Sequence, residues 1–159
     1  MTARVLMLGS EQLTMAQADR IATVFKRQGA SIMRQNLSQI RWGEFCSALQ
    51  GASHVLLILS KACHAAAKRN VEEVVKLVDL MSEDTRPRMS ALFLDDVSVT
   101  EYSWLLAENH VTLAFASNPF LIGKMPQVRN RVLIGNLIEV APVLLFVQEI
   151  IGENSLTAA

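Results

Sequence analysis

One uninterrupted apolar segment limits the folds that are open to this chain. It reads HVLLIL, from His54 to Leu59, and it shows no alternation of apolar and polar residues. A strand of this kind is covered on both faces, as in the centre of a parallel sheet that lies between two layers of helices. We therefore expect an α/β architecture.

Strand and helix patterns alternate along the rest of the chain. Short apolar runs predict strands, and apolar residues spaced by three and four predict helices. The strands are expected at 4–8, 30–35, 54–59, 89–96 and 110–116, and the helices at 14–29, 42–52, 65–81, 99–109 and 129–151. Thr14 is expected to cap the start of the first helix and Gly29 to end it. The alternation predicts a flavodoxin-like three-layer α/β domain, a five-stranded parallel sheet with helices on both faces.

Charge and residue usage argue against several classes of protein. Lys plus Arg and Asp plus Glu are equal at 15 each, whereas a nucleic-acid binder that depends on phosphate contacts needs an excess of basic residues. No segment reaches the ~18 uninterrupted apolar residues of a membrane span, and the first residues do not read as a signal peptide. We therefore expect a cytoplasmic protein without membrane insertion. The two cysteines and three histidines show no metal-ligand spacing, so we expect no metal.

Polar residues follow several of the predicted strands. In an open parallel sheet, ligands bind outside the carboxyl ends of the strands, and Ser10, Arg34 and Ser60 are expected there. The first turn reads LGSEQLT and contains neither a dinucleotide fingerprint nor a phosphate-binding loop. A conventional Rossmann or P-loop site is therefore disfavoured.

Two adjacent glutamates lie on the helix that follows the central strand. The apolar stripe of this helix contains Val71, Val74, Val75 and Val78. At about 100° per residue, Glu73 points nearly opposite the stripe, and Glu72 lies at its edge. We expect Glu73 in solvent and Glu72 partly desolvated, available as a base or hydrogen-bond partner. The alternative is an ordinary boundary residue, with Lys76 four positions further on.

The segment FCSALQGASHVLLILSKACHAAAKRNVEEVV, residues 45–75, resembles the TIR (Toll/interleukin-1 receptor) domain family. In that family a small-residue step precedes an apolar strand that ends in Leu-Ser, and a glutamate follows that Ser by about a dozen residues. Here Ala52-Ser53 fills the small step, Leu59-Ser60 closes the strand, and Glu72 stands twelve residues after Ser60. Looser matches extend over residues 4–150. The resemblance implies one TIR-like domain over residues 1–159.

The resemblance also implies an activity. Catalytic TIR domains cleave the glycosidic bond of NAD⁺ and release nicotinamide, as glycohydrolases or as cyclases that form cyclic ADP-ribose, in immune or cell-death signalling. Glu72 would be the catalytic carboxylate, with Ser10, Arg34, Trp42 and Ser60 as substrate contacts. NAD⁺ would then be a substrate, and no cofactor is expected.

Two other functions remain open at this point. The Trp-Cys that usually precedes the family's glutamate reads Lys68-Arg69 here, and the Pro-Gly of the loop after the second strand is absent. These departures fit a catalytically inactive TIR-like module that assembles with other TIR-like domains. A nucleoside deoxyribosyltransferase-like enzyme would also use a glutamate after the third strand.

Apolar residues on two faces of the expected helix at 129–151 indicate an oligomer or partner surface, so we expect a homo-oligomer.

Overall fold

We describe the protein from a computed structural model. The structure describes residues 3–9, 12–59, 65–93, 101–102, 104–105, 111–115 and 131–133. Its strands are β1 (Arg4–Gly9), β2 (Ser31–Asn36), β3 (His54–Leu59), β4 (Arg88–Phe93), β5 (Val111–Phe115) and β6 (Arg131–Leu133), and its helices are α1 (Gln12–Arg27), α2 (Trp42–Gly51) and α3 (Ala65–Asp79).

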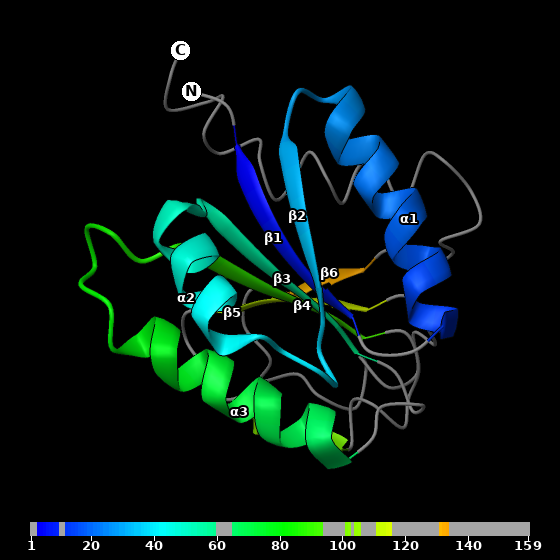
Figure 1. The fold of residues 1–159 in the computed structure, drawn as a ribbon. Coiled ribbons are helices and arrows are strands. Elements are labelled where there is room, and N and C mark those ends of the chain that lie inside the picture. Colours follow the sequence, from blue (N-terminus) through cyan, green and yellow to red (C-terminus); the bar gives the residue numbers. More distant parts are fainter. Residues whose placement is uncertain are drawn as a thin grey trace.

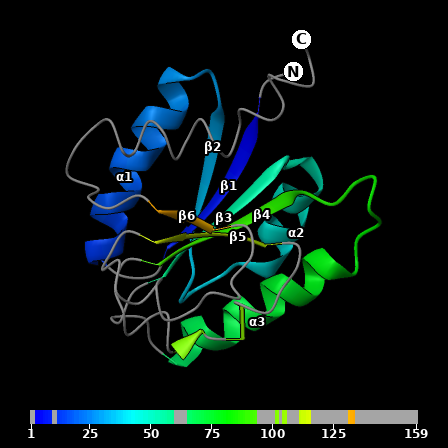
Figure 2. The same cartoon turned by 180° about the vertical axis from the view of Figure 1, so that it is seen from behind.

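All described strands pair in parallel, in the order β2-β1-β3-β4-β5-β6. The first five follow the order that is typical of flavodoxin-like sheets. Figures 1 and 2 show α1 on one face of this sheet and α2 with α3 on the other. The predicted parallel α/β architecture with helices on both faces is therefore confirmed.

The central strand is buried as its sequence predicts. All six residues of β3 are buried, and so are the last five of β1 and of β4. Side chains of these strands alternate between two packed layers. On the α2–α3 face, Leu6, Leu57 and Ala91 join one core cluster with Phe45 of α2 and Val71 of α3.

The ends of helices α1 and α3 agree only in part with the ends predicted from the sequence. Gly29 has φ of +86°, in the left-handed region where glycine carries no Cβ penalty, and it ends α1 as predicted. The N-cap prediction is wrong, because α1 begins at Gln12 and Thr14 lies inside its first turn. The third helix ends at Asp79, two residues before the predicted Met81.

The predicted count of five strands is not confirmed, because a sixth strand is present. Arg131–Leu133 was expected to begin a helix over 129–151, but it pairs with β5, with Val132 beside Ala114. Backbone pairing with a neighbouring strand overrides the helical spacing there. The rest of that predicted helix, and most of the one at 99–109, lies outside the described residues.

Candidate functional site

The carboxyl edge of the sheet near β1 is where this topology places a ligand. The chain passes from β1 to β2 through α1 on one face, and from β2 to β3 through α2 on the other. The crossovers therefore diverge between β1 and β3, and open sheets bind ligands at such a switch point. Gly9, Asn36 and Leu59 end β1, β2 and β3 at this edge.

A tightly bonded turn follows β2 at this edge. The Asn36 Oδ1 accepts a hydrogen bond of 2.9 Å from the backbone N–H of Ser38, which is an Asx turn. The backbone N–H of Leu37 donates to the carbonyl of Gly9 at 3.0 Å, and Leu37 is fully buried. The turn is therefore fixed to the end of β1 as well as to β2.

Asn70 joins helix α3 to the same turn. Its Nδ2 donates a hydrogen bond of 2.7 Å to the carbonyl of Leu37, thirty-three residues away in sequence. Asn70 flanks the buried stripe of α3 and is half-buried itself. This hydrogen bond holds α3 against the turn, next to the carboxyl edge of the sheet.

Two polar atoms close to this turn are buried without a hydrogen bond to any described residue. They are the Oε1 of Gln35, at the end of β2, and the Oγ of Ser38. Buried polar atoms in native proteins normally have a partner, either protein or ordered water. Together with Asn36 and Asn70 they form a polar corner among the described residues of the carboxyl edge. Asn36 and Ser38 were detectable in the sequence as the Asn-x-Ser spacing of an Asx turn, whereas nothing local marks Asn70.

Glu72 is exposed, and the prediction that it is partly desolvated is wrong. The positions that border the buried stripe are occupied by two other residues of α3, Asn70 and Lys68, both half-buried. Lys68 lies on the same side of the helix as Glu72, and its Nζ is 3.3 Å from a carboxylate oxygen of Glu101. The Glu72 carboxylate therefore lies outside that border, in solvent.

Glu73 lies in solvent as predicted. Its carboxylate is 3.6 Å from the Nζ of Lys76 on the next turn of the helix, and 55% of its side chain is exposed. Glu72 makes no ion pair or hydrogen bond with another described residue. The two adjacent glutamates thus differ in charge pairing, although both are exposed.

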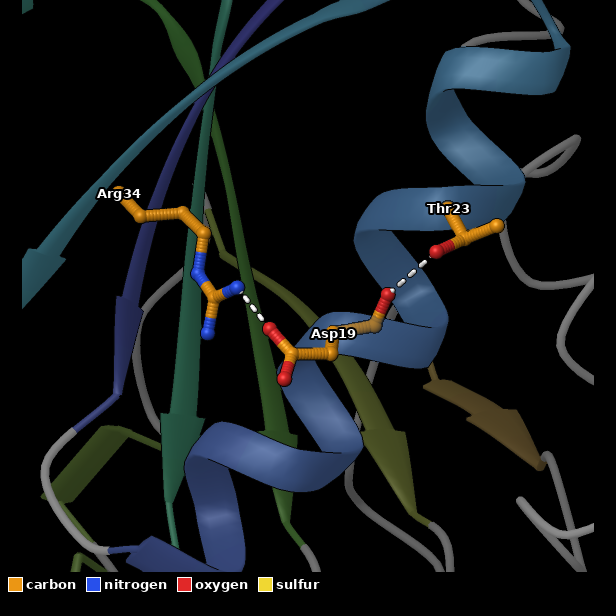
Figure 3. A network of polar contacts seen from close by, with 3 residues as sticks. All are labelled: Asp19, Thr23 and Arg34. Atoms are coloured by element: carbon orange, nitrogen blue, oxygen red, sulfur yellow. Dashed lines mark hydrogen bonds and ion pairs between the residues drawn. The ribbon is translucent and has the colours of Figure 1, made fainter.

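Arg34 points to the opposite face of the sheet from α3. Figure 3 shows its guanidinium directed at the carboxylate of Asp19 on α1, with which it forms an ion pair. The backbone carbonyl of Asp19 in turn accepts a hydrogen bond of 2.8 Å from the Thr23 hydroxyl. The sheet therefore separates Arg34 from Glu72, and the structure does not bring these two predicted site residues together.

Trp42 is the first residue of α2 and packs onto the core. Its ring meets that of Phe45 edge-on, with centroids 5.5 Å apart and an interplanar angle of 82°. Aromatic pairs favour this T-shaped arrangement. Trp42 is half-buried, so it anchors the start of α2, and its role in stacking on a base stays a prediction. Ser10 and Ser60, the remaining predicted contacts, lie outside the described residues.

The described residues contain no group of three or more His, Cys, Asp or Glu side chains placed to hold a metal ion. In the same part of the chain, none of the helices combines the length and the apolar character that crossing a bilayer requires.

Comparison with known proteins identifies the fold and no family. No protein-family model matches the chain, and no curated protein matches its sequence. Among solved structures, the chain is similar to rubredoxin oxygen:oxidoreductase from the anaerobe Desulfovibrio gigas, with a TM-score of 0.56 and 12% sequence identity over 99% of this chain. The chain spans 37% of the length of that protein. At this identity, the similarity shows a shared fold alone.

Proposed function

We propose that this chain is a TIR-like domain that binds NAD⁺ at the carboxyl edge of its sheet and cleaves the bond between nicotinamide and ribose. The proposal rests on the resemblance of residues 45–75, and it agrees with the flavodoxin-like order of the first five strands. The corner formed by Gln35, Ser38 and Asn70 lies on the other flank of α3 from Glu72, so it is not part of this proposed catalytic site.

The observation that carries the proposal is that the exposed carboxylate of Glu72 has no ion-pair partner among the described residues. Glu72 lies on the helix that follows the central strand, and the neighbouring Glu73 is paired with Lys76. An exposed ion pair of this kind contributes at most about 1 kcal/mol, so it makes Glu73 slightly less available than Glu72 to a cationic transition state. Glu72 is the more available of the two.

The chemistry expected of Glu72 is electrostatic. As the bond from the ribose C1′ to the nicotinamide nitrogen breaks, its electron pair leaves with nicotinamide and positive charge develops on the ribose. A nearby carboxylate stabilises this oxocarbenium-like state and can hold a ribose hydroxyl. Water then adds to C1′ and releases a proton. Because Glu72 is exposed and about two turns from the start of α3, bound NAD⁺ or a second subunit must exclude water from it.

The test is nicotinamide release from NAD⁺ by concentrated protein and by three variants. Glu72→Gln and Glu72→Ala should lower kcat by about 100-fold or more, the usual cost of losing one such electrostatic group. Glu73→Ala is the matched control, an adjacent exposed glutamate whose loss should leave turnover within about twofold. Equal losses in the Glu72 and Glu73 variants would refute the assignment.

The structure also favours one alternative, a non-catalytic interaction module. Arg34 is ion-paired on the other face of the sheet and Trp42 packs on the core, so the predicted contacts do not converge on Glu72. Absence of turnover at every protein concentration, including conditions that drive assembly, would favour this module. Base exchange between nucleosides, lost in Glu72→Ala, would instead indicate a deoxyribosyltransferase-like enzyme.

A further inference from the structure

Strand β2 has one edge that pairs with no other described strand. Within the described part of the chain it pairs with β1 on one side and is the last strand of the sheet (Figure 1). The backbone N–H groups of Ser31 and Leu37 donate to carbonyls at Ala3 and Gly9, which directs every second residue toward β1. The N–H and C=O groups of Ile32 and Arg34 therefore point outward, where another strand can bond to them.

Few of the usual protections of an edge strand are found in β2 itself. Natural edges carry charged side chains, especially lysine, or prolines, which deter pairing with another chain. The sequence of β2, SIMRQN, has one charged residue and no proline. That residue, Arg34, is drawn to Asp19 over the α1 face (Figure 3).

A protruding apolar side chain and a pocket lie together on the other face of this edge. Met33 is 53% exposed, although methionine is an apolar residue. Beside it, between β2, β1 and the last turns of α2, is a mainly apolar pocket of about 270 Å³. Its lining includes Leu6, Ser31, Met33, Ser47, Ala48 and Gly51. The small residues of α2 leave this space open over the two strands.

We propose that two copies of this chain pair through β2, antiparallel, about a two-fold axis at Ile32. A two-fold interface requires a patch that is complementary to itself, so a protruding group and its receiving pocket must lie on the same patch. With the axis at Ile32, Ser31 stands opposite the partner's Met33. Directly opposed residues point to the same face of a sheet, so the partner's Met33 enters the pocket beside Ser31.

Charge disfavours one alternative register. An axis at Arg34 would place two arginines opposite each other, which is unfavourable in a cross-strand pair. The axis at Ile32 places Arg34 opposite the partner's Ala30 instead. The chain has a formal net charge of zero, so no overall repulsion opposes association of two copies. The proposal does not depend on NAD⁺ cleavage.

The first test is sedimentation equilibrium of the full chain over a wide concentration range. The unaltered chain should form a dimer, and Met33→Lys should raise the dissociation constant by about tenfold or more, because two buried methionines are lost per dimer. Leu80→Lys is the matched control, since Leu80 is another exposed large apolar residue, 83% accessible, just after α3. A monomer at the highest concentration reached, or equal effects of the two lysines, would overturn the proposal.

The pocket and the register can be tested separately. Ser47→Phe fills the pocket from an exposed position on α2, and it should weaken the dimer while circular dichroism shows the fold retained. For the register, cysteines are introduced after both native cysteines are changed to serine. Ser31→Cys combined with Met33→Cys should yield a disulfide-linked dimer, and each change alone should not. Efficient linkage through Met33→Cys alone would place the axis at Met33 and refute the register.

Discussion

Replacing Asn70 by alanine tests whether the bond between α3 and the turn after β2 stabilises the fold. The Nδ2 of Asn70 donates 2.7 Å to the carbonyl of Leu37, a residue with no exposed surface. Without its partner, that buried acceptor costs about 1–3 kcal/mol. Alanine favours a helix over asparagine by about 0.7 kcal/mol, so the net loss of unfolding free energy should be about 0.3–2.3 kcal/mol.

Urea denaturation, followed by tryptophan fluorescence, measures this loss. For a chain of 159 residues, each kcal/mol shifts Tm by about 2–4 °C, so a parallel thermal scan should show a decrease of about 1–9 °C. Asn70→Asp keeps the size of the side chain but turns the donor into an acceptor facing the Leu37 carbonyl, and it should be less stable than Asn70→Ala. If Asn70→Ala equals or exceeds the unaltered chain in stability, the hydrogen bond contributes nothing and the reasoning fails.

Two further predictions concern the ends of secondary-structure elements and their surface charges. Gly29→Ala should lower the unfolding free energy by about 1–2 kcal/mol, because φ is +86°. No atom lies within 4 Å of a Cβ built there, so the whole cost is backbone strain. Gly29→Asn should recover part of this loss, and an unchanged stability of the alanine variant would contradict this origin. A double-mutant cycle of Asp19→Ala and Arg34→Ala should give a coupling below about 1 kcal/mol that falls further with added salt, because 66% and 29% of these side chains are exposed. A coupling above about 2 kcal/mol that is insensitive to salt would show that the pair is shielded from water.

Part of the candidate site was predictable, because its residues follow strand ends that are recognisable locally. The carboxyl ends of β1, β2 and β3 lie at one edge, as the alternation of strands and helices implies. The exposure of Glu73 also follows from helical spacing alone. The first feature depends on the order of strands and helices along the chain, and the second on the order of residues within one helix.

Other parts of the site depend on which elements are neighbours. The alternation of side chains along β2 directs Arg34 to one face of the sheet, but only the packing of α1 on that face places Asp19 within its reach. Asn70 became a site residue because the turn after β2 reaches α3.

The amino-acid sequence by itself determined the central strand β3, the stripe of α3 and the glycine that ends α1, since each depends on burial or backbone geometry within a short segment. Only the tertiary structure decided that Arg131–Leu133 is a strand, because the bonds that make it one are donated and accepted by β5. It also decided that β2 lies at the edge of the sheet, beside a pocket and an exposed methionine. Strand order and edge exposure arise from contacts between segments far apart in the chain, which no local pattern contains.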